Sequence, residues 1–205
     1  RLVEKGLVIG SWGNVSVRLG DKVVITPSGA DYASLGDEDI SVIDLASGDY
    51  EGPKPSSEKG LHLEVYRQRK EIGAVIHVHS PNTSTLAAAR RELPPILDDV
   101  AQLIGPNVRV ADYALPSTKK IVRTTIRALR GRMAALMANH GAICLGHDME
   151  RAVNNVEILE KCSLAYLLAL CTERPVSRIP LPVREIAFAR LRKDQKRVER
   201  EIEEP

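Results

Sequence analysis

The sequence predicts an α+β layered domain whose central sheet is mostly antiparallel. In the first quarter of the chain, short runs of alternating apolar and polar residues flank glycine-containing turns, as expected of hairpins. Further along, segments of helical periodicity alternate with short, wholly apolar strands. Hairpins mixed with helices pack as layers around one core, and 205 residues suffice for a single domain. We therefore expect one domain over 1–205.

The N-terminal part is predicted to hold the end of a helix and two strand pairs. Residues 2–9 have the pattern of a helix end. Because the chain opens on Arg1, inside that pattern, we expect a preceding N-terminal segment to be missing. The predicted strands are 15–18 and 22–26, joined by a turn at Gly20-Asp21, and 39–45, followed by a turn at 46–49.

From Ser57 the apolar spacing becomes helical. Leu61, Val65 and Tyr66 fall on one face, Ser56 or Ser57 is expected to cap the helix, Glu58 lies in its first turn and Gly73 ends it. The elements predicted after it are a strand at 74–78, a helix opening at Pro81-Asn82, a loop over 93–100, a strand at 109–114, a helix capped by Ser117 or Thr118 and ending at Leu129, strands at 133–138 and 142–145, a helix over 148–172 and a helical tail over 186–205.

The composition argues against several classes of partner. A net charge of +2 gives no signal for a polyanion, and an aromatic content of 3% is too low for a base-stacking surface. Apolar runs fall short of the ~18 residues of a membrane span, and no secretory signal is visible. Three cysteines without a C-x-x-C spacing indicate a reduced compartment. We expect a cytoplasmic protein with neither nucleic acid nor membrane as partner.

Three histidines and one glutamate form a candidate metal site. His77 and His79 lie two apart in a predicted strand and so point to the same face. His140 occupies a turn between two buried strands, and Glu58 begins the helix that precedes the histidine strand. Three imidazoles and a carboxylate suit Zn²⁺ with room for a substrate. The alternative is histidines hydrogen-bonded to backbone groups. His62, four residues after Glu58, is expected to pack behind the site.

Small polar residues and glycines at predicted turns form a candidate anion site. They can offer backbone N–H groups, hydroxyls or an amide, and the last pair lies at a helix N-terminus, which favours anions. The alternative for each pair is an ordinary turn or helix cap. Because the last pair directly precedes Glu58, we expect a phosphorylated substrate to reach from these residues to the metal. The residues are Gly13, Asn14, Ser28, Gly29, Ser56 and Ser57.

Taken together, these motifs resemble the class II sugar-phosphate aldolases of the fuculose-phosphate aldolase type. Their superfamily also contains ribulose-phosphate 4-epimerase and the adducin head domain. The resemblance covers nearly the whole chain through G-S-W-G-N-V-S-V-R, I-T-P-S-G, P-S-S-E, V-I-H-V-H-S and A-N-H-G-A. It implies the class II aldolase/adducin-head fold, in which helices flank both faces of a mostly antiparallel sheet.

The resemblance also implies roles for the candidate residues. His77, His79 and His140 would bind one Zn²⁺ per subunit. Glu58 would be the fourth ligand and the catalytic acid–base group. The six residues of the anion site would hold the substrate phosphate. The protein would be a homotetramer with active sites at the subunit interfaces.

The implied activity is that of a lyase of carbohydrate metabolism. It would cleave a ketose 1-phosphate such as L-fuculose 1-phosphate to dihydroxyacetone phosphate and an aldehyde, through a zinc-stabilised enediolate. Alternatives are a pentulose 5-phosphate 4-epimerase, a related decarboxylase or dehydratase, and an adducin-like interaction domain without catalysis. Epimerase relatives have Asp where this chain has Glu58, which favours the aldolase. Asp98 stands where these aldolases have a catalytic tyrosine, which leaves the aldehyde and the native reaction open.

Overall fold

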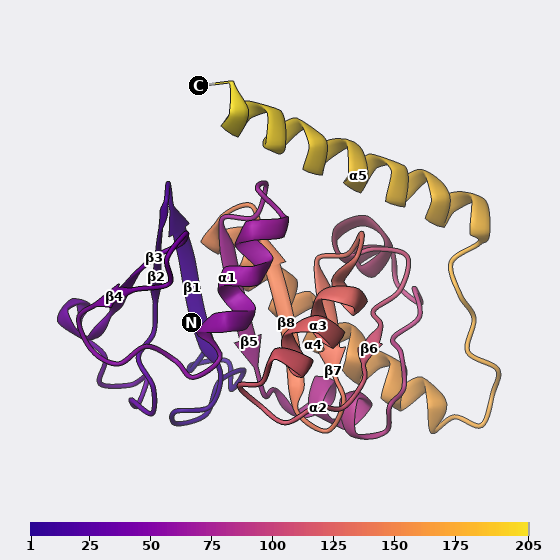
Figure 1. Ribbon diagram of the computed structural model, residues 1–205. Helices are drawn as coiled ribbons and strands as arrows, with labels where there is room; N and C mark the ends of the chain where they lie inside the picture. The colour runs from indigo at the N-terminus through magenta and orange to yellow at the C-terminus, as the bar shows by residue number, and fades with distance from the viewer. Residues whose placement is uncertain (205) are drawn as a thin grey trace.

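A single eight-stranded sheet forms the centre of the structure, a computed structural model that describes residues 1–204 (Figure 1). The strand order is β4-β3-β2-β1-β5-β8-β7-β6, and every neighbouring pair is antiparallel except β6 and β7. The prediction of an α+β fold with a mostly antiparallel sheet is confirmed. The strands are β1 Asn14–Leu19, β2 Lys22–Ile25, β3 Ser41–Asp44, β4 Tyr50–Glu51, β5 Ala74–Val78, β6 Val110–Ala111, β7 Ala134–Met137 and β8 Gly141–Gly146.

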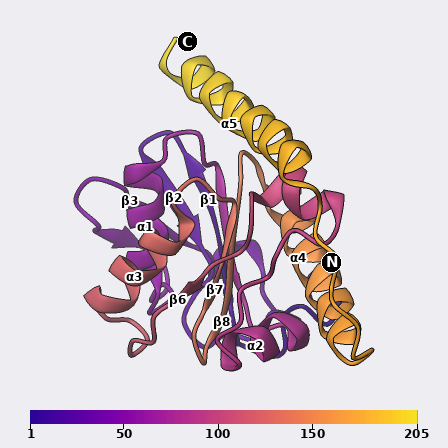
Figure 2. The ribbon, with the colours of Figure 1, turned by 90° about the vertical axis from the view of Figure 1, so that its right-hand side faces the viewer.

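Helices cover both faces of this sheet (Figure 2). On one face α1 and α3 pack against the sheet, and on the other α2 and α4 do so. Among residues 1–204, no helix combines the length and the hydropathy that a membrane span requires. The helices are α1 Lys59–Gln68, α2 Pro81–Ala88, α3 Lys119–Leu129, α4 Met149–Leu170 and α5 Leu181–Glu203.

The histidine strand β5 lies near the middle of the sheet, between β1 and β8. All five of its residues are buried, because helices cover both of its faces. Ala74, Ile76 and Val78 contribute to the core under α2 and α4. Val75 contributes to the core under α1 and α3, so His77, two residues on, points to the face on which α1 begins. The alternation of β5 therefore directs His77 towards the start of α1.

Several predicted boundaries are wrong. Residues 2–9 form turns, because Gly6 and Gly10 adopt positive φ angles of 64° and 57° that interrupt a helix. The helix α1 ends at Gln68, before Gly73, and Glu58 is its N-cap residue, not part of its first turn. A π-helical turn, Val100–Ile104, follows the predicted loop, and the predicted strand over 109–114 shrinks to β6.

The structure resolves the alternatives for capping the two helices that follow loops. Neither serine hydroxyl makes the side-chain cap of α1, although the Glu58 N–H donates to Ser56 Oγ over 3.3 Å. At α3 the cap is Thr118, whose Oγ1 accepts from the Ile121 N–H. Ser117 has a φ of 62°, and this left-handed conformation places it before the cap.

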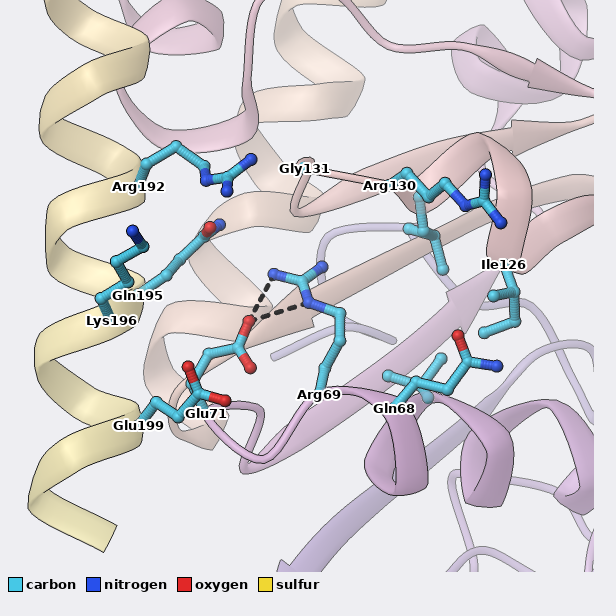
Figure 3. Close-up of a pocket in the computed structure, with 12 residues that line it drawn as sticks. Gln68, Arg69, Glu71, Ile126, Arg130, Gly131, Arg192, Gln195, Lys196 and Glu199 are labelled. Atoms are coloured by element: carbon cyan, nitrogen blue, oxygen red, sulfur yellow. Dashed lines mark hydrogen bonds and ion pairs between the residues drawn. The ribbon is translucent and has the colours of Figure 1, made fainter. Parts of the chain in front are cut away.

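The C-terminal helix α5 begins at Leu181, five residues earlier than predicted, and extends along one end of the domain (Figure 1). A cavity of about 330 Å³ separates it from the loops that follow α1 and α3 (Figure 3). Gln195 projects from α5 into this cavity and its amide contacts Met133 Sδ, while Arg69 and Glu71 pair on the opposite wall. His147 links the same regions, since Nδ1 bonds the Glu71 carbonyl and Nε2 lies 3.4 Å from Asp194 of α5.

Candidate metal centre and active site

The three predicted histidines converge on one point at the edge of the sheet. His77 lies in β5, one residue before its end, His79 follows that strand, and His140 lies in the turn between β7 and β8, which pairs with β5. The Nε2 atom of His77 lies 2.9 Å from Nε2 of His79 and 3.0 Å from Nε2 of His140. The three ligand atoms all lie within 4.8 Å of one another. Tetrahedral Zn²⁺ sites, with bonds of about 2.0–2.1 Å, require comparably close nitrogen atoms.

A hydrogen bond to the neighbouring strand β8 fixes the orientation of the His77 ring. Its Nδ1 donates a hydrogen bond of 2.9 Å to the Ala142 carbonyl oxygen, which leaves the lone pair on Nε2 directed at the other two rings. Two glycines allow the neighbouring loops to approach this strand closely. A Cβ atom on Gly13, where φ is 96°, would lie 2.6 Å from the His77 carbonyl oxygen, and one on Gly141 would collide with the Val78 carbonyl oxygen.

Glu58 completes this group from the start of α1. Its Oε2 lies 3.1 Å from His77 Nε2 and accepts a hydrogen bond of 3.1 Å from Asn14 Nδ2. Its Oε1 lies 3.5 Å from His140 Nε2 and is buried without a hydrogen-bond partner. A buried carboxylate oxygen with no donor, close to an imidazole nitrogen of the histidine cluster, is the arrangement expected where a cation takes the place of donors. The donor set therefore fits a divalent metal.

The electrostatics of the site favour the protonation state that ligates metals. Burial raises the pKa of Glu58, but the electrostatic effect of His77 and His140 and the Asn14 hydrogen bond outweigh it, so the net shift is downward. Burial lowers the pKa of His79 to about 4, and His77 and His140 act in the same direction. Burial, reinforced by His77, also lowers the pKa of His140. An ionised carboxylate beside the neutral imidazoles of His79 and His140 is ready to bind a metal near neutral pH.

A cavity of about 440 Å³ joins the candidate metal site to the candidate anion site. Glu58, His79 and His140 line it, and His77 is fully buried beside them. The cavity is also lined by all six residues of the candidate anion site: Gly13, Asn14, Ser28, Gly29, Ser56 and Ser57. The two groups that the sequence placed in separate motifs thus face one volume, as expected for a ligand that touches both.

Backbone hydrogen bonds hold the loops of the candidate anion site together. The Ser28 N–H donates to the Lys54 carbonyl over 2.9 Å, and the Ser56 N–H donates to the Thr26 carbonyl over 3.1 Å. Tyr32 Oη donates to the Gly13 carbonyl over 2.9 Å, which anchors the third loop. These bonds place the loops side by side although they lie far apart in the sequence.

The structure adds further residues to those predicted to form the site. Trp12, the only tryptophan, is 65% exposed and lines the cavity, with its ring centroid 5.5 Å from that of His79. Asn139 also lines the cavity, in a left-handed conformation with a φ of 55°. Asp98 is exposed and is absent from the residues that line the cavity, while Asp99 pairs with Lys161. The position of Trp12 next to Gly13 in the sequence indicates a place in the wall of the anion site, with packing as the alternative, and the structure places Trp12 in the cavity wall.

Comparison with known proteins identifies the family. Residues 1–167 match the model of the class II aldolase and adducin N-terminal domain. The chain belongs to this family. Its class II aldolase relatives include a 5-methylthioribulose-1-phosphate/5-deoxyribulose-1-phosphate aldolase of Rhodospirillum rubrum, 37% identical over 171 residues, which are 83% of this chain and 77% of that protein. An L-fuculose phosphate aldolase of Methanocaldococcus jannaschii is 36% identical over 174 residues, 85% of this chain and 94% of that protein.

A solved structure of an L-fuculose 1-phosphate aldolase superposes on this class II aldolase fold with a TM-score of 0.87 at 35% sequence identity. The match covers 93% of this chain and 91% of that structure. The resemblance to the fuculose-phosphate type of class II aldolase is therefore confirmed, and with it the assignment to a lyase family. Within that family the cluster of His77, His79 and His140 is the group of residues able to hold the metal on which class II aldolases depend.

Proposed function

We propose that this chain is a Zn²⁺-dependent aldolase that cleaves a ketose 1-phosphate to dihydroxyacetone phosphate and an aldehyde. One observation carries the proposal: a cluster of three imidazoles and an unbonded carboxylate oxygen opens into the same cavity as six polar turn residues. A sugar phosphate offers both the oxygen atoms that a metal binds and the anion that such turns bind. The names of the two relatives agree in giving a sugar 1-phosphate or a sugar phosphate as the substrate of an aldolase.

The proposed ligands of one Zn²⁺ per subunit are His77, His79, His140 and, before substrate binds, Glu58. Nitrogen ligands with one carboxylate suit this borderline ion better than the hard cations, which prefer oxygen. When bound, the ion would supply Lewis-acid polarisation of the substrate carbonyl and would stabilise the negative charge that develops next to it.

Glu58 is proposed to move the proton of the reaction. In the direction of addition its carboxylate takes a proton from the carbon beside the carbonyl, and in the direction of cleavage its carboxyl group returns that proton to the same carbon. The unbonded Oε1 is the atom available for this transfer, because Asn14 holds Oε2. Among residues 1–204, no lysine lines the cavity, which supports a reaction without a Schiff base.

The six anion-site residues are proposed to bind the substrate phosphate. Hydroxyls of Ser28, Ser56 and Ser57, the Asn14 amide and backbone N–H groups beside Gly13 and Gly29 are donors of the kind that bind phosphate. All of these donors are uncharged, so the ionised phosphate would be bound by neutral groups. Such pairing favours recognition of geometry over recognition of charge alone.

We further propose a cytoplasmic homotetramer with active sites completed at subunit interfaces. Apolar side chains exposed on α4 and α5, among them Leu164, Leu168 and Ile186, support burial against other subunits. The three cysteines are all free thiols, one of them exposed, which supports a reducing compartment. Light scattering would give the number of subunits directly.

The function is tested by incubating the purified protein with a panel of ketose 1-phosphates and measuring dihydroxyacetone phosphate. We expect release that EDTA abolishes and added Zn²⁺ restores. Cleavage unaffected by metal removal would contradict the proposal. Conversion of a pentulose 5-phosphate to its epimer without free aldehyde would establish the epimerase, and carbon dioxide from a phosphorylated acid would establish the decarboxylase.

A further inference from the structure

A buried chain of hydrogen bonds runs behind the candidate site, on the side away from the cavity. It links Tyr66, Ser16, His62, Asn14 and Glu58 in that order. The successive distances are 2.8 Å from Tyr66 Oη to Ser16 Oγ, 2.7 Å from Ser16 Oγ to His62 Nδ1, 2.5 Å from His62 Nε2 to Asn14 Oδ1 and 3.1 Å from Asn14 Nδ2 to Glu58 Oε2. All five side chains are buried, but only Asn14 and Glu58 line the cavity.

The groups at the cavity end fix the direction of this chain. The Glu58 carboxylate only accepts hydrogen bonds, so the Asn14 amide must turn its NH₂ group towards it. The carbonyl oxygen of that amide then faces His62 and also only accepts, so His62 must carry its proton on Nε2. Full burial favours the neutral ring, whose Nδ1 is therefore an acceptor for the Ser16 hydroxyl.

Tyr66 fixes the other end. Its hydroxyl lies 3.0 Å from the Ser16 carbonyl oxygen, to which it donates, and 2.8 Å from Ser16 Oγ. The Tyr66 proton is thus directed at Ser16, which leaves the Ser16 hydroxyl proton for His62. Glu58, His62 and Tyr66 are spaced four residues apart at the start and along one face of α1, and Asn14 and Ser16 share one face of β1. One helix and one strand therefore supply all five side chains of this chain of hydrogen bonds.

We propose that His62 is a positioning residue of the active site, which acts by holding the Asn14 amide with its NH₂ group towards Glu58 and the cavity. The inference rests on the proposed function, since it assigns a role within that active site. One amide hydrogen bonds Glu58, and among residues 1–204 the other has no protein acceptor, so a substrate oxygen can take it. In the flipped orientation an amide oxygen would face the carboxylate, two acceptors without a proton between them.

The first test measures the His62 ring itself in the wild-type protein. Nitrogen-15 NMR distinguishes a protonated Nε2 from a protonated Nδ1, and a buried N–H hydrogen bond gives a low-field proton signal that exchanges slowly with water. We expect the Nε2–H tautomer of a neutral ring for His62. The Nδ1–H tautomer, or a doubly protonated ring at pH 7, would overturn the proposal. Neither form allows Nε2 to donate to Asn14 while Nδ1 accepts from Ser16.

The second test compares two substitutions of His62. His62→Gln keeps an amide N–H near the position of Nε2, whereas His62→Leu fills similar space without a donor. We expect Leu to weaken Zn²⁺ binding, measured by competition with a chelator, by about 10–100-fold, and Gln to restore most of it, as for other residues that orient metal ligands. If His62 only fills space, a different result is expected. Thermal stability then changes in both variants, while the affinities for Zn²⁺ and for inorganic phosphate stay the same.

The two proposals fail in distinguishable ways. If the wild-type protein cleaves no sugar phosphate, the proposed function fails, while the tautomer of His62 and the Zn²⁺ affinities of the variants still decide the role of His62. If cleavage is observed and His62→Leu matches the wild type in Zn²⁺ affinity, in KM and in kcat, the role of His62 is rejected and the proposed function stands.

Discussion

Glu58 is a buried carboxylate whose two oxygens have different surroundings. Oε2 is held by Asn14 and lies beside His77, while Oε1 has no hydrogen-bond partner and faces His140. An unbonded buried carboxylate oxygen is unfavourable unless a ligand or a cation compensates it. At the scale of residues, Oε1 of Glu58 is therefore an atom that a bound cation or substrate would stabilise.

Replacing Glu58 by Gln tests its proposed role as the group that moves the proton. The amide keeps the shape of the side chain but cannot accept a proton, so we expect kcat to fall by about 10²–10⁴-fold. Zn²⁺ content, measured by elemental analysis, should remain close to one per subunit, because three imidazoles still bind it. Activity within tenfold of the wild type would assign the proton transfer to another group.

The buried histidines predict acid sensitivity of the metal-free protein. Burial lowers the pKa of His62 to about 3 and of His79 to about 4, below the ordinary value of 6.5. Between about pH 6.5 and 4 the unfolded chain therefore binds more protons than the folded one, so the free energy of unfolding falls as pH falls. The slope is about 1.4 kcal/mol per pH unit for each such histidine.

Urea unfolding at several pH values between 7 and 4.5, with a chelator present, measures this slope. His79→Gln removes one titrating group, so its stability should fall less steeply over the same range. Equal slopes for the variant and the wild type would show that His79 titrates alike in the folded and unfolded chains.

At the scale of elements, α4 holds the start of α2 in place directly after His79. The Glu160 carboxylate of α4 accepts hydrogen bonds from Ser80 Oγ, from the Asn82 N–H and side-chain amide, and from the Thr83 N–H. The two backbone N–H groups are unpaired donors of a helix N-terminus, here satisfied by a side chain from another helix. The segment that carries His79 out of β5 is thereby fixed on the far face of the sheet.

We expect Glu160→Ala to lower the free energy of unfolding by about 1–3 kcal/mol, because it leaves partly buried donors unpaired. Glu157→Ala is a matched control on the same helix. Glu157 pairs with exposed Arg1 and Lys5, and such surface pairs contribute about 0–1 kcal/mol. Chemical denaturation of both variants measures the difference, and equal losses would mean that Glu160 is no more important than a surface charge.

At the scale of the whole molecule, the candidate metal ligands come from segments spread over more than eighty positions. Glu58 precedes α1, His77 and His79 belong to β5 and the residues after it, and His140 lies between β7 and β8. An ion bound by all of them would therefore favour the folded state of the entire domain, since the unfolded chain cannot assemble the set.

Zn²⁺ should accordingly raise the melting temperature of the metal-free protein. At a free concentration one thousand times Kd, the expected stabilisation is about 4 kcal/mol. His77→Ala removes the central ring, whose Nε2 lies closest to both others, and should abolish the shift. A shift that persists in this variant would place the bound ion elsewhere.

Local sequence patterns predicted most strands and helices because their causes lie within a few residues. The short apolar runs of β5, β7 and β8 are typical of buried strands, and the apolar spacing in α1 has the period of a helix. The misassigned ends depend on backbone conformations at single residues, such as Ser117 with its positive φ, that no periodicity reports. The π-helical turn Val100–Ile104 has no local signature for the same reason.

For the site, the sequence by itself determined which chemical groups are present: three imidazoles, a carboxylate and six donors at turns, in motifs specific enough to indicate the family. Only the tertiary structure decided that they share one cavity, that Oε1 of Glu58 lacks a partner, and that His62 contacts Asn14 while Asp98 stays outside. Strand pairing across the sheet brings β1, β5 and β8 side by side, and the resulting distances depend on contacts between residues far apart in the chain. The spacing of residues within a local segment of the sequence does not report such contacts.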